Sequence, residues 1–278
     1  MSVTGVCSYV LGSEYTLVPP LYLYKYRSLR DNLAKERLKA TLFNQELHFS
    51  IHTEFNDLFD CNIHVSSTAD PAICASRLRE LNPEMSDAEI HSLVEHELSP
   101  ERSAEIDRGV RAGVSDALAQ VGIFSLSAKP DDLLMWSYYA DGHRGVCLQF
   151  RLQEGRVFGC DVTQVQYEEL YPSLTAYDEM TLDWTRRHLS TKAKAWEHEA
   201  EWRIIWRQPG LNRFPAEDIS GVILGARIPL QDRAEIISWI RESRARPLLY
   251  EARTKTAAFG VDIVPLGDVG GTDCPTAS

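Results

Sequence analysis

The sequence predicts an α+β protein with a mixed, mostly antiparallel sheet core, flanking helices and a helical insertion. Short segments rich in β-branched and aromatic residues alternate with segments of helical spacing, and several strand-like segments are close enough to pair without a crossover. Between residues 67 and 120 Asp and Glu become frequent, aromatic residues are absent, and the spacing is helical. We therefore expect one α+β domain over residues 1–266, with a helical insertion at 67–120.

The first third of the chain predicts a strand, a helix and a second short strand. Residues 21–27 are aromatic-rich and typical of a strand. Ser28 or Asp31 can cap a helix over residues 31–42, where leucines recur near helical spacing. A second strand is expected at 46–51, and the Asn- and Asp-rich residues 55–60 that follow it are typical of a turn.

The insertion carries its own helix signals. Ser86 and Glu89 have the spacing of a capping box, and the residues after them form one apolar stripe. Pro100 interrupts the pattern, and a second helix is expected from about residue 101 to residue 121.

The rest of the chain continues to alternate between strand and helix patterns. We expect strands over 123–127, 145–150, 162–167, 219–224 and 261–266, and helices over 133–140, 174–196 and 232–244. The Gly-rich residues 267–278 predict a disordered tail.

Composition limits the function classes. The 278 residues carry a net charge of −11, so a broad basic surface for nucleic acid is absent, although a local basic groove stays open. The six cysteines lie far apart without zinc-type spacing, and we predict no metal site. No apolar run approaches the length of a membrane span, and the start lacks the pattern of a signal peptide. We expect a cytoplasmic protein with no membrane partner.

Residues 192–203 form the candidate site, because they combine three carboxylates, three basic side chains and a histidine with two tryptophans. If a strand begins near His198, alternation places Glu199, Glu201 and Arg203 on one face, with apolar residues on the other. Such a charged face suits a polar cleft and is a candidate active site. The alternative is a capped edge strand that carries a solvated ion pair.

Several segments resemble a bacterial family known as domain of unknown function 2971, some relatives of which are labelled abortive-phage-resistance proteins. The resemblance covers roughly residues 21–228 without the insertion. The segments that carry it are Tyr24–Arg27, Leu47–Ser50, Phe55–Asp57, Phe59–Asp60, Trp136–Ala140 with His143 and Gly145, Trp196 with Glu199, Glu201 and Arg203, and Val222–Gly225. The chain departs from that pattern at Leu58, where the family usually has Pro.

The order of elements also resembles, more distantly, that of ADP-ribosyltransferases. In that superfamily a first-strand polar residue holds NAD, a middle-strand Ser or Tyr shapes the nicotinamide pocket, and a late Glu is catalytic. The chain has neither His-x-Thr nor Ser-Thr-Ser, so the likeness rests on the order of elements and on Glu-x-Glu. It implies NAD as a substrate and Glu201 or Glu199 as the catalytic carboxylate. The cofactor contacts that it implies are Lys25, Tyr26, Arg27, Ser50, Tyr139, His143 and Arg203.

The resemblances together imply a toxin or anti-phage effector that uses NAD to modify a nucleic acid or a protein, with a phage or operon partner. Stabilisation of an oxocarbenium-like state by a carboxylate is the chemistry that such an enzyme needs.

Two other function classes stay open, and so does the question of whether the protein is an enzyme. Asn56, Asp57 and Asp60, with the Glu-rich stretch beside Lys192 and Lys194, suit a metal-dependent nuclease. A polar cleft also suits a non-catalytic sensor of a nucleotide or a phage protein.

Overall fold

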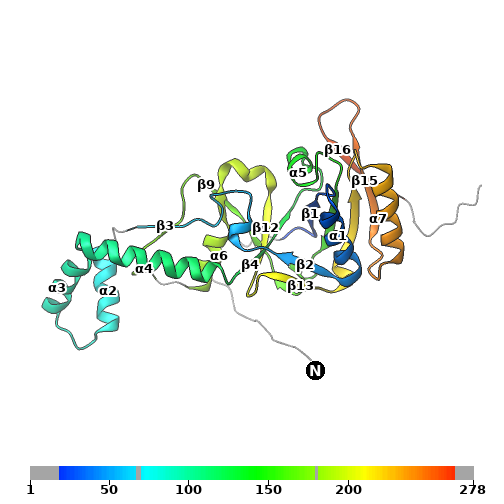
Figure 1. Cartoon of the computed structure of the whole chain (residues 1–278). Coiled ribbons are helices and arrows are strands. Elements are labelled where there is room, and N and C mark those ends of the chain that lie inside the picture. The colour runs from blue at the N-terminus through cyan, green and yellow to red at the C-terminus, as the bar shows by residue number, and fades with distance from the viewer. Residues whose placement is uncertain (1–18, 67–69, 179–180, 267–278) are drawn as a thin grey trace, which may run out of the picture.

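One large sheet forms the centre of the protein. The structure is a computed structural model that describes residues 19–66, 70–178 and 181–266, and it confirms the α+β class (Figure 1). Within these residues an eight-stranded sheet has the order β16 (Val261–Pro265), β15 (Leu248–Thr254), β14 (Ile219–Leu224), β5 (Val146–Arg151), β1 (Tyr22–Arg27), β4 (Gly122–Ser127), β12 (Glu201–Trp206) and β8 (Thr163–Gln164). Among these strands β14 and β15 are parallel and the other neighbours antiparallel, so the sheet is mixed and mostly antiparallel, as predicted.

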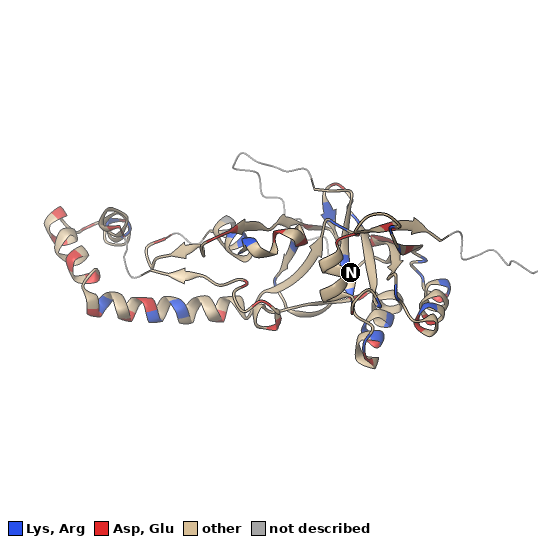
Figure 2. Ribbon diagram, turned by 90° about the horizontal axis from the view of Figure 1, so that it is seen from above, with Lys and Arg blue, Asp and Glu red and all other residues tan. Residues whose placement is uncertain are grey.

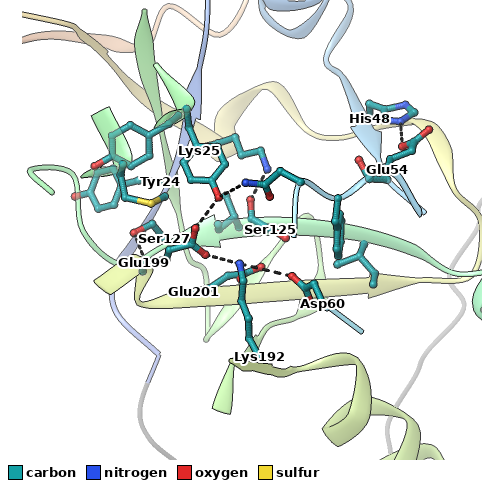
Figure 3. Close-up of a pocket in the computed structure, with 18 residues that line it drawn as sticks. Tyr24, Lys25, His48, Glu54, Asp60, Ser125, Ser127, Lys192, Glu199 and Glu201 are labelled. Carbon is teal, nitrogen blue, oxygen red and sulfur yellow. Dashed lines mark hydrogen bonds and ion pairs between the residues drawn. The ribbon is translucent and has the colours of Figure 1, made fainter. Parts of the chain in front are cut away.

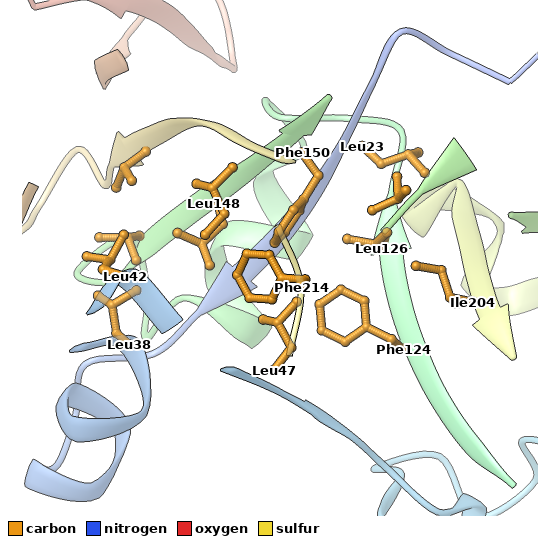
Figure 4. Close-up of a cluster of buried hydrophobic side chains, with 14 of the residues drawn as sticks. Leu23, Leu38, Leu42, Leu47, Phe124, Leu126, Leu148, Phe150, Ile204 and Phe214 are labelled. Atoms are coloured by element: carbon orange, nitrogen blue, oxygen red, sulfur yellow. The ribbon is translucent and has the colours of Figure 1, made fainter. Parts of the chain in front are cut away.

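Two apolar clusters hold helices against the two faces of this sheet. On one face, Leu148 and Phe150 of β5 pack with Leu38 and Leu42 of α1 (Asn32–Asn44), and α7 (Leu230–Glu242) joins the same cluster (Figure 4). On the other face, α5 (Leu133–Tyr139) packs the Trp136 ring at a right angle to a strand tyrosine. Because strand side chains alternate between faces, β1, β5, β14 and β15 contribute to both clusters. Each fully buried large apolar side chain stabilises the fold by roughly 1.5–3 kcal/mol.

The helical insertion projects from the body as an arm instead of lying beside the sheet (Figure 1). It consists of α2 (Pro71–Leu81), α3 (Asp87–Glu97) and α4 (Pro100–Leu118), with a small core of its own. The predicted capping box is present, since the side chains and backbone N–H groups of Ser86 and Glu89 bond reciprocally. Acidic and basic residues lie along the helices of the arm (Figure 2). Helix α4 returns to the body and leads directly into β4.

Short strand pairs and 3₁₀ helices connect the larger elements. The pairs are β2 (Glu46–Phe49) with β13 (Gly210–Arg213), β3 (His64–Val65) with β10 (Ser173–Leu174), β6 (Arg156–Val157) with β7 (Cys160–Asp161), and β9 (Gln166–Glu168) with β11 (Thr191–Ala193). The short helices are η1 (His52–Glu54), η2 (Lys194–Glu199), η3 (Ala216–Asp218) and α6 (Leu182–Leu189).

The structure corrects three predictions about these elements. Residues 174–196 are not largely helical, because α6 is short and the chain then forms β11, which pairs with β9, and η2. Strand β15 was not predicted, although it lies between β14 and β16. The expected strand at 162–167 is split, since β8 pairs with β12 whereas β9 pairs with β11.

Two further expectations concern the membrane and the chain end. Among the described helices none is long and apolar enough to cross a bilayer. The tail at 267–278 lies outside the described residues.

Candidate functional site

The large sheet has a seam beside β4. Strand β1 pairs with β5 at six positions but with β4 at one, where Tyr24 is opposite Ser127. At the other end of β4, on the same edge, Ile123 pairs with Ser50, which directly follows β2. Ser125 lies between these two bridges, and its carbonyl oxygen accepts a hydrogen bond of 2.7 Å from Lys25 Nζ. The edge of β4 is therefore open where two neighbouring strands diverge.

A pocket of about 250 Å³ occupies this seam (Figure 3). Its walls come from β1, from the β2–η1 turn, from the loop at residues 55–60, from β4 and from α5. Three charged residues of the predicted site region, Lys192, Glu199 and Glu201, also line it. These charged residues of the candidate stretch therefore do not form a solvated ion pair on an edge strand, because they line a pocket between β1 and β4.

Lys192 joins three carboxylates at the bottom of this pocket. Its Nζ lies 2.5 Å from Glu199 Oε2, 3.0 Å from Glu201 Oε2 and 3.6 Å from Asp60 Oδ2. Lysine and its three partners are all buried. Buried charges of this kind need paired geometry, since an unpaired charge in the interior costs several kcal/mol.

Arg203 lies beneath the pocket and completes the cluster. Its side chain has no exposed surface, and its guanidinium donates to Glu201 through Nε at 2.8 Å and to Asp60 through Nη2 at 2.6 Å. Nη1 donates to the Leu189 carbonyl oxygen at 2.7 Å. By formal charge, three carboxylates face two cations, so the cluster carries one net negative charge.

These contacts fix the charge state of Glu201. Burial alone would raise the pKa of this carboxyl, but the charges of Arg203 and Lys192, with hydrogen bonds from Arg203 and Ser125, hold the pKa well below its usual range. Burial likewise opposes the charge of Lys192, yet Glu201, Glu199 and Asp60 raise the pKa of the ammonium. Glu201 is therefore an ionised carboxylate with a fixed orientation.

Lys25 is a pocket residue with a lowered pKa. The side chain is half-buried, with its Nζ 5.0 Å from the centroid of the Phe124 ring. Burial and the charge of Arg27 lower the pKa of this amine to about 7, although Glu201 and Glu199 act in the opposite direction. A lysine in this range exchanges a proton near neutral pH, as a catalytic or ligand-binding group does.

Tyr139 orients the other carboxylate. Its hydroxyl donates to Glu199 Oε1 at 2.6 Å and accepts from Asn56 Nδ2 at 3.2 Å. Burial and the charge of Glu199 raise the pKa of this phenol, so it remains a donor. The two glutamates are thus held by different partners, one by a phenol and an ammonium, the other by a guanidinium and an ammonium.

The local sequence explains how the glutamates meet. In β12 the side chains alternate, so Trp202 and Ile204 enter the apolar core while Glu201 and Arg203 face the pocket side, as predicted. The condition that a strand begins near His198 is not met, because η2 ends at Glu199 and β12 begins at Glu201. Ala200 then adopts a left-handed conformation with φ of 44°, and this turn brings Glu199 beside Glu201.

The structure brings together most of the residues expected to contact a cofactor. Lys25, Tyr26, Ser50 and Tyr139 line the pocket with Glu199 and Glu201. Arg203 is buried below it and holds Glu201 and Asp60 instead of facing the cavity.

Two of the expected residues lie outside the pocket lining. Arg27 is past the seam, where β1 pairs with Val146 of β5, and burial, with the charge of Arg37 on α1, lowers the pKa of its guanidinium. His143 lies behind α5, with its ring stacked on Trp136 at a centroid distance of 6.0 Å.

Sequence reasoning missed the serines of β4. Ser125 and Ser127 line the pocket, Ser125 bonds Glu201, and Ser127 Oγ donates to the Glu199 carbonyl oxygen at 2.6 Å. The alternation of Phe124 and Leu126 with these serines was visible in the sequence and assigns them to one face. What the sequence did not show is that β4 lies beside β12.

The carboxylates do not form a metal site of the kind that a nuclease needs. The ammonium of Lys192 lies between Asp60, Glu199 and Glu201, where a divalent cation would have to bind. In the part of the chain that the structure describes, no group of three or more His, Cys, Asp and Glu residues is arranged to hold a metal ion. Asp57 caps a turn, since its Oδ1 accepts from the Phe59 N–H at 3.0 Å.

Comparison with known proteins supports the first of the two resemblances over part of the chain. A family model described as "Protein of unknown function (DUF2971)" matches residues 135–204. No curated protein and no solved structure matches the chain. The matched segment runs from α5 to β12, so it includes Tyr139, Lys192, Glu199, Glu201 and Arg203. Apart from Asp60, the charged residues of the cluster at the bottom of the pocket therefore lie within the part of the chain that matches the family.

Proposed function

We propose that the protein is an ADP-ribosyltransferase-like enzyme whose pocket binds the nicotinamide–ribose end of NAD. The observation that carries the proposal is that three neighbouring strands contribute polar residues to the same pocket. The polar strand β1, the serine-bearing strand β4 and the Glu-x-Glu strand β12 are consecutive neighbours in the sheet and line one pocket. The resemblance assigns to an NAD site a polar first strand, a middle strand with Ser or Tyr and a late strand with Glu. The serine-bearing strand between β1 and β12 is β4 with Ser125, whereas Ser50, the serine that the resemblance implied, follows β2, which pairs with β13 outside the large sheet.

The chemistry of the pocket suits cleavage of the bond between ribose and nicotinamide. This reaction passes through an oxocarbenium-like state, and a preorganised carboxylate stabilises the positive charge that develops on the sugar. Glu201 is ionised and held in place by Arg203 and Lys192. In this proposal Glu201 is the carboxylate beside the ribose, and Glu199 with Tyr139 shapes the adjoining wall.

The size of the pocket limits what it can enclose. Its volume of about 250 Å³ is slightly below the roughly 300–1,000 Å³ of pockets that enclose a drug-sized ligand. It can enclose the nicotinamide and its ribose, while the diphosphate and the adenylate half lie outside. Lys25, which is half-buried in the wall, is the cation placed to meet the ribose or the nearer phosphate.

The cellular role stays a prediction of the resemblances. A toxin or anti-phage effector with a phage or operon partner, acting on a nucleic acid or a protein, is consistent with this site. The position of Lys192 among the carboxylates supports this proposal over a metal-dependent nuclease.

The experiment is incubation of the protein with NAD labelled on its adenylate half, with bacterial lysate and nucleic acid present. Label on a macromolecule, or release of ADP-ribose and nicotinamide, is the expected result. The Glu201→Gln variant should lose this activity by roughly 100-fold or more, because one electrostatic stabiliser is typically worth that much.

The matched control is Glu197→Gln. Glu197 belongs to the same stretch but is exposed, so its variant should keep the activity. Full activity of a folded Glu201→Gln protein would overturn the assignment. Binding of NAD without turnover in the wild-type protein would favour the sensor.

A further inference from the structure

The pocket contains a second polar pair that the reaction proposed above does not use. His48 of β2 and Glu54 of η1 line the pocket, and His48 Nε2 lies 2.8 Å from Glu54 Oε2 (Figure 3). Leu47 and Phe49 are buried in the core, so alternation along β2 turns His48 away from the core. The pair is partly exposed, with 36% of the His48 side chain and 46% of the Glu54 side chain accessible.

The partners of Glu54 fix the tautomer of His48. Hydrogen bonds from His48 and Ser50 lower the pKa of the Glu54 carboxyl, which is therefore ionised and can only accept. The proton of the neutral imidazole is thus on Nε2, and the lone pair is on Nδ1. No described residue is bonded to Nδ1. A histidine oriented by a carboxylate in this way is the arrangement of a general base.

The pair and the glutamates reach the pocket from opposite sides of β4. Strand β12, which carries Glu201, pairs along one edge of β4. The end of β2 is fixed to the other edge by two backbone bonds of 2.9 and 2.8 Å between Ser50 and Ile123. A sugar bound between them would have the carboxylate and the imidazole on different sides, as a displacement reaction requires.

We propose that His48, held by Glu54, is the general base that activates the acceptor of the ADP-ribosyl group, and that this acceptor is a hydroxyl group. The inference rests on the proposed function. An imidazole can take the proton of an alcohol or of water as its oxygen attacks. An acceptor carboxylate, or a ring nitrogen that carries a lone pair instead of a hydrogen, has no proton to lose and needs no base. A guanidinium is too weak an acid for imidazole to deprotonate.

The step is balanced as follows. The bond between ribose C1′ and the nicotinamide nitrogen breaks, and its electron pair neutralises the pyridinium ring. A bond forms between C1′ and the acceptor oxygen, and the hydroxyl proton moves to His48 Nδ1, from which it passes to solvent. The products are the O-linked ADP-ribosyl acceptor, neutral nicotinamide and one proton.

The test compares two reactions of the same enzyme. Exchange of labelled nicotinamide into NAD needs cleavage of the glycosidic bond but no base, because the ring nitrogen of nicotinamide carries no proton. Transfer to water or to added methanol needs both cleavage and the base. We expect His48→Ala to lose hydrolysis and methanolysis by about 100-fold or more, whereas exchange falls far less. Glu54→Gln should lose transfer in the same selective way, and Glu201→Gln should lose both reactions.

The matched control is His91→Ala on the arm. His91 and Glu95 form a comparable pair, 3.6 Å apart, on an exposed helix face far along the chain. Its removal should alter neither reaction. Hydrolysis and methanolysis at the wild-type rate in His48→Ala would overturn the base and leave the proposed function intact. A wild-type protein with neither exchange nor transfer would overturn the proposed function, and the base with it.

Discussion

Replacing Lys192 with methionine removes the ammonium that joins three buried carboxylates while keeping a side chain of similar length. In the wild-type protein this ammonium lies 2.5 Å from Glu199 and 3.0 Å from Glu201. Arg203 contacts Glu201 and Asp60 but makes no ion pair with Glu199. In the variant, Glu201 and Asp60 keep the Arg203 guanidinium, whereas Glu199 has no cation and retains the Tyr139 hydroxyl as its remaining strong donor.

The expected loss of stability is large. Breaking a buried ion pair by removing one partner costs about 3–5 kcal/mol, because the other charge stays buried without compensation. At roughly 2–4 °C per kcal/mol for a chain near this size, the melting temperature should fall by roughly 6–20 °C. Replacing Glu199 with glutamine as well should recover part of the loss, since a neutral amide no longer needs a cation.

Urea unfolding of the variants, followed by circular dichroism, measures these differences. Lys194→Met is the control, because the Lys194 ammonium is exposed and lies 3.8 Å from Glu169. Its free energy of unfolding should stay within about 0.5 kcal/mol of the wild-type value. If Lys192→Met were as stable as this control, the cluster would not be held by Lys192. If the two substitutions at 192 and 199 were simply additive, their coupling would be refuted.

Three other predictions follow from the same geometry. Burial is the main cause that lowers the pKa of Lys25 to about 7, so at pH 7.5 its amine should be acetylated faster than that of exposed Lys194. Mass spectrometry after competitive labelling measures the two rates, and equal rates would contradict this prediction. The pKa of Glu201 is lower in the folded than in the unfolded chain, so its contribution to stability is present above about pH 4.3 and is lost as the pH falls below it. Urea unfolding at a series of acid pH values should therefore show a shallower pH dependence for Glu201→Gln, and an unchanged slope would count against the buried carboxylate. A Cβ at Gly145 would lie 2.1 Å from the Arg27 carbonyl oxygen, so Gly145→Ala should lower the free energy of unfolding by about 1–3 kcal/mol, measured by thermal unfolding. A Cβ at Gly109 on α4 would have no atom within 4 Å, so Gly109→Ala should be neutral or stabilising by up to about 1 kcal/mol. The reverse order of stability would refute the packing argument.

Local features of the fold could be predicted from the sequence. The capping box of α3 is confirmed, and of the two residues expected to cap α1 the structure has Asp31, because both caps depend on side chains within a few residues of the backbone groups that they bond. The alternation that separates Glu201 and Arg203 from Trp202 and Ile204 is confirmed as well, because successive side chains of a strand point to opposite faces.

The parts of the site that sequence reasoning did not assemble depend on long-range pairing. Asp60 joins Arg203 across a separation of 143 residues, and no local pattern indicates this contact. Glu199 reaches the cluster through the left-handed turn at Ala200, a conformation that alanine rarely adopts. Strand β15 was missed because its pairing with β14 and β16 is decided by tertiary packing.

The seam beside β4 has a mechanical consequence. Between most neighbouring strands of the large sheet, a ladder of backbone pairs would have to break before the strands could separate, whereas β1 and β4 are joined by one pair, Tyr24 with Ser127. The hydrogen bond from Lys25 Nζ to the Ser125 carbonyl oxygen is a further link between β1 and β4. A ligand whose phosphate or ribose bound Lys25 would break this hydrogen bond and replace it with a contact to the ligand. Filling the pocket therefore changes how firmly the two parts of the sheet are held together, and amide hydrogen exchange along β4 would report it.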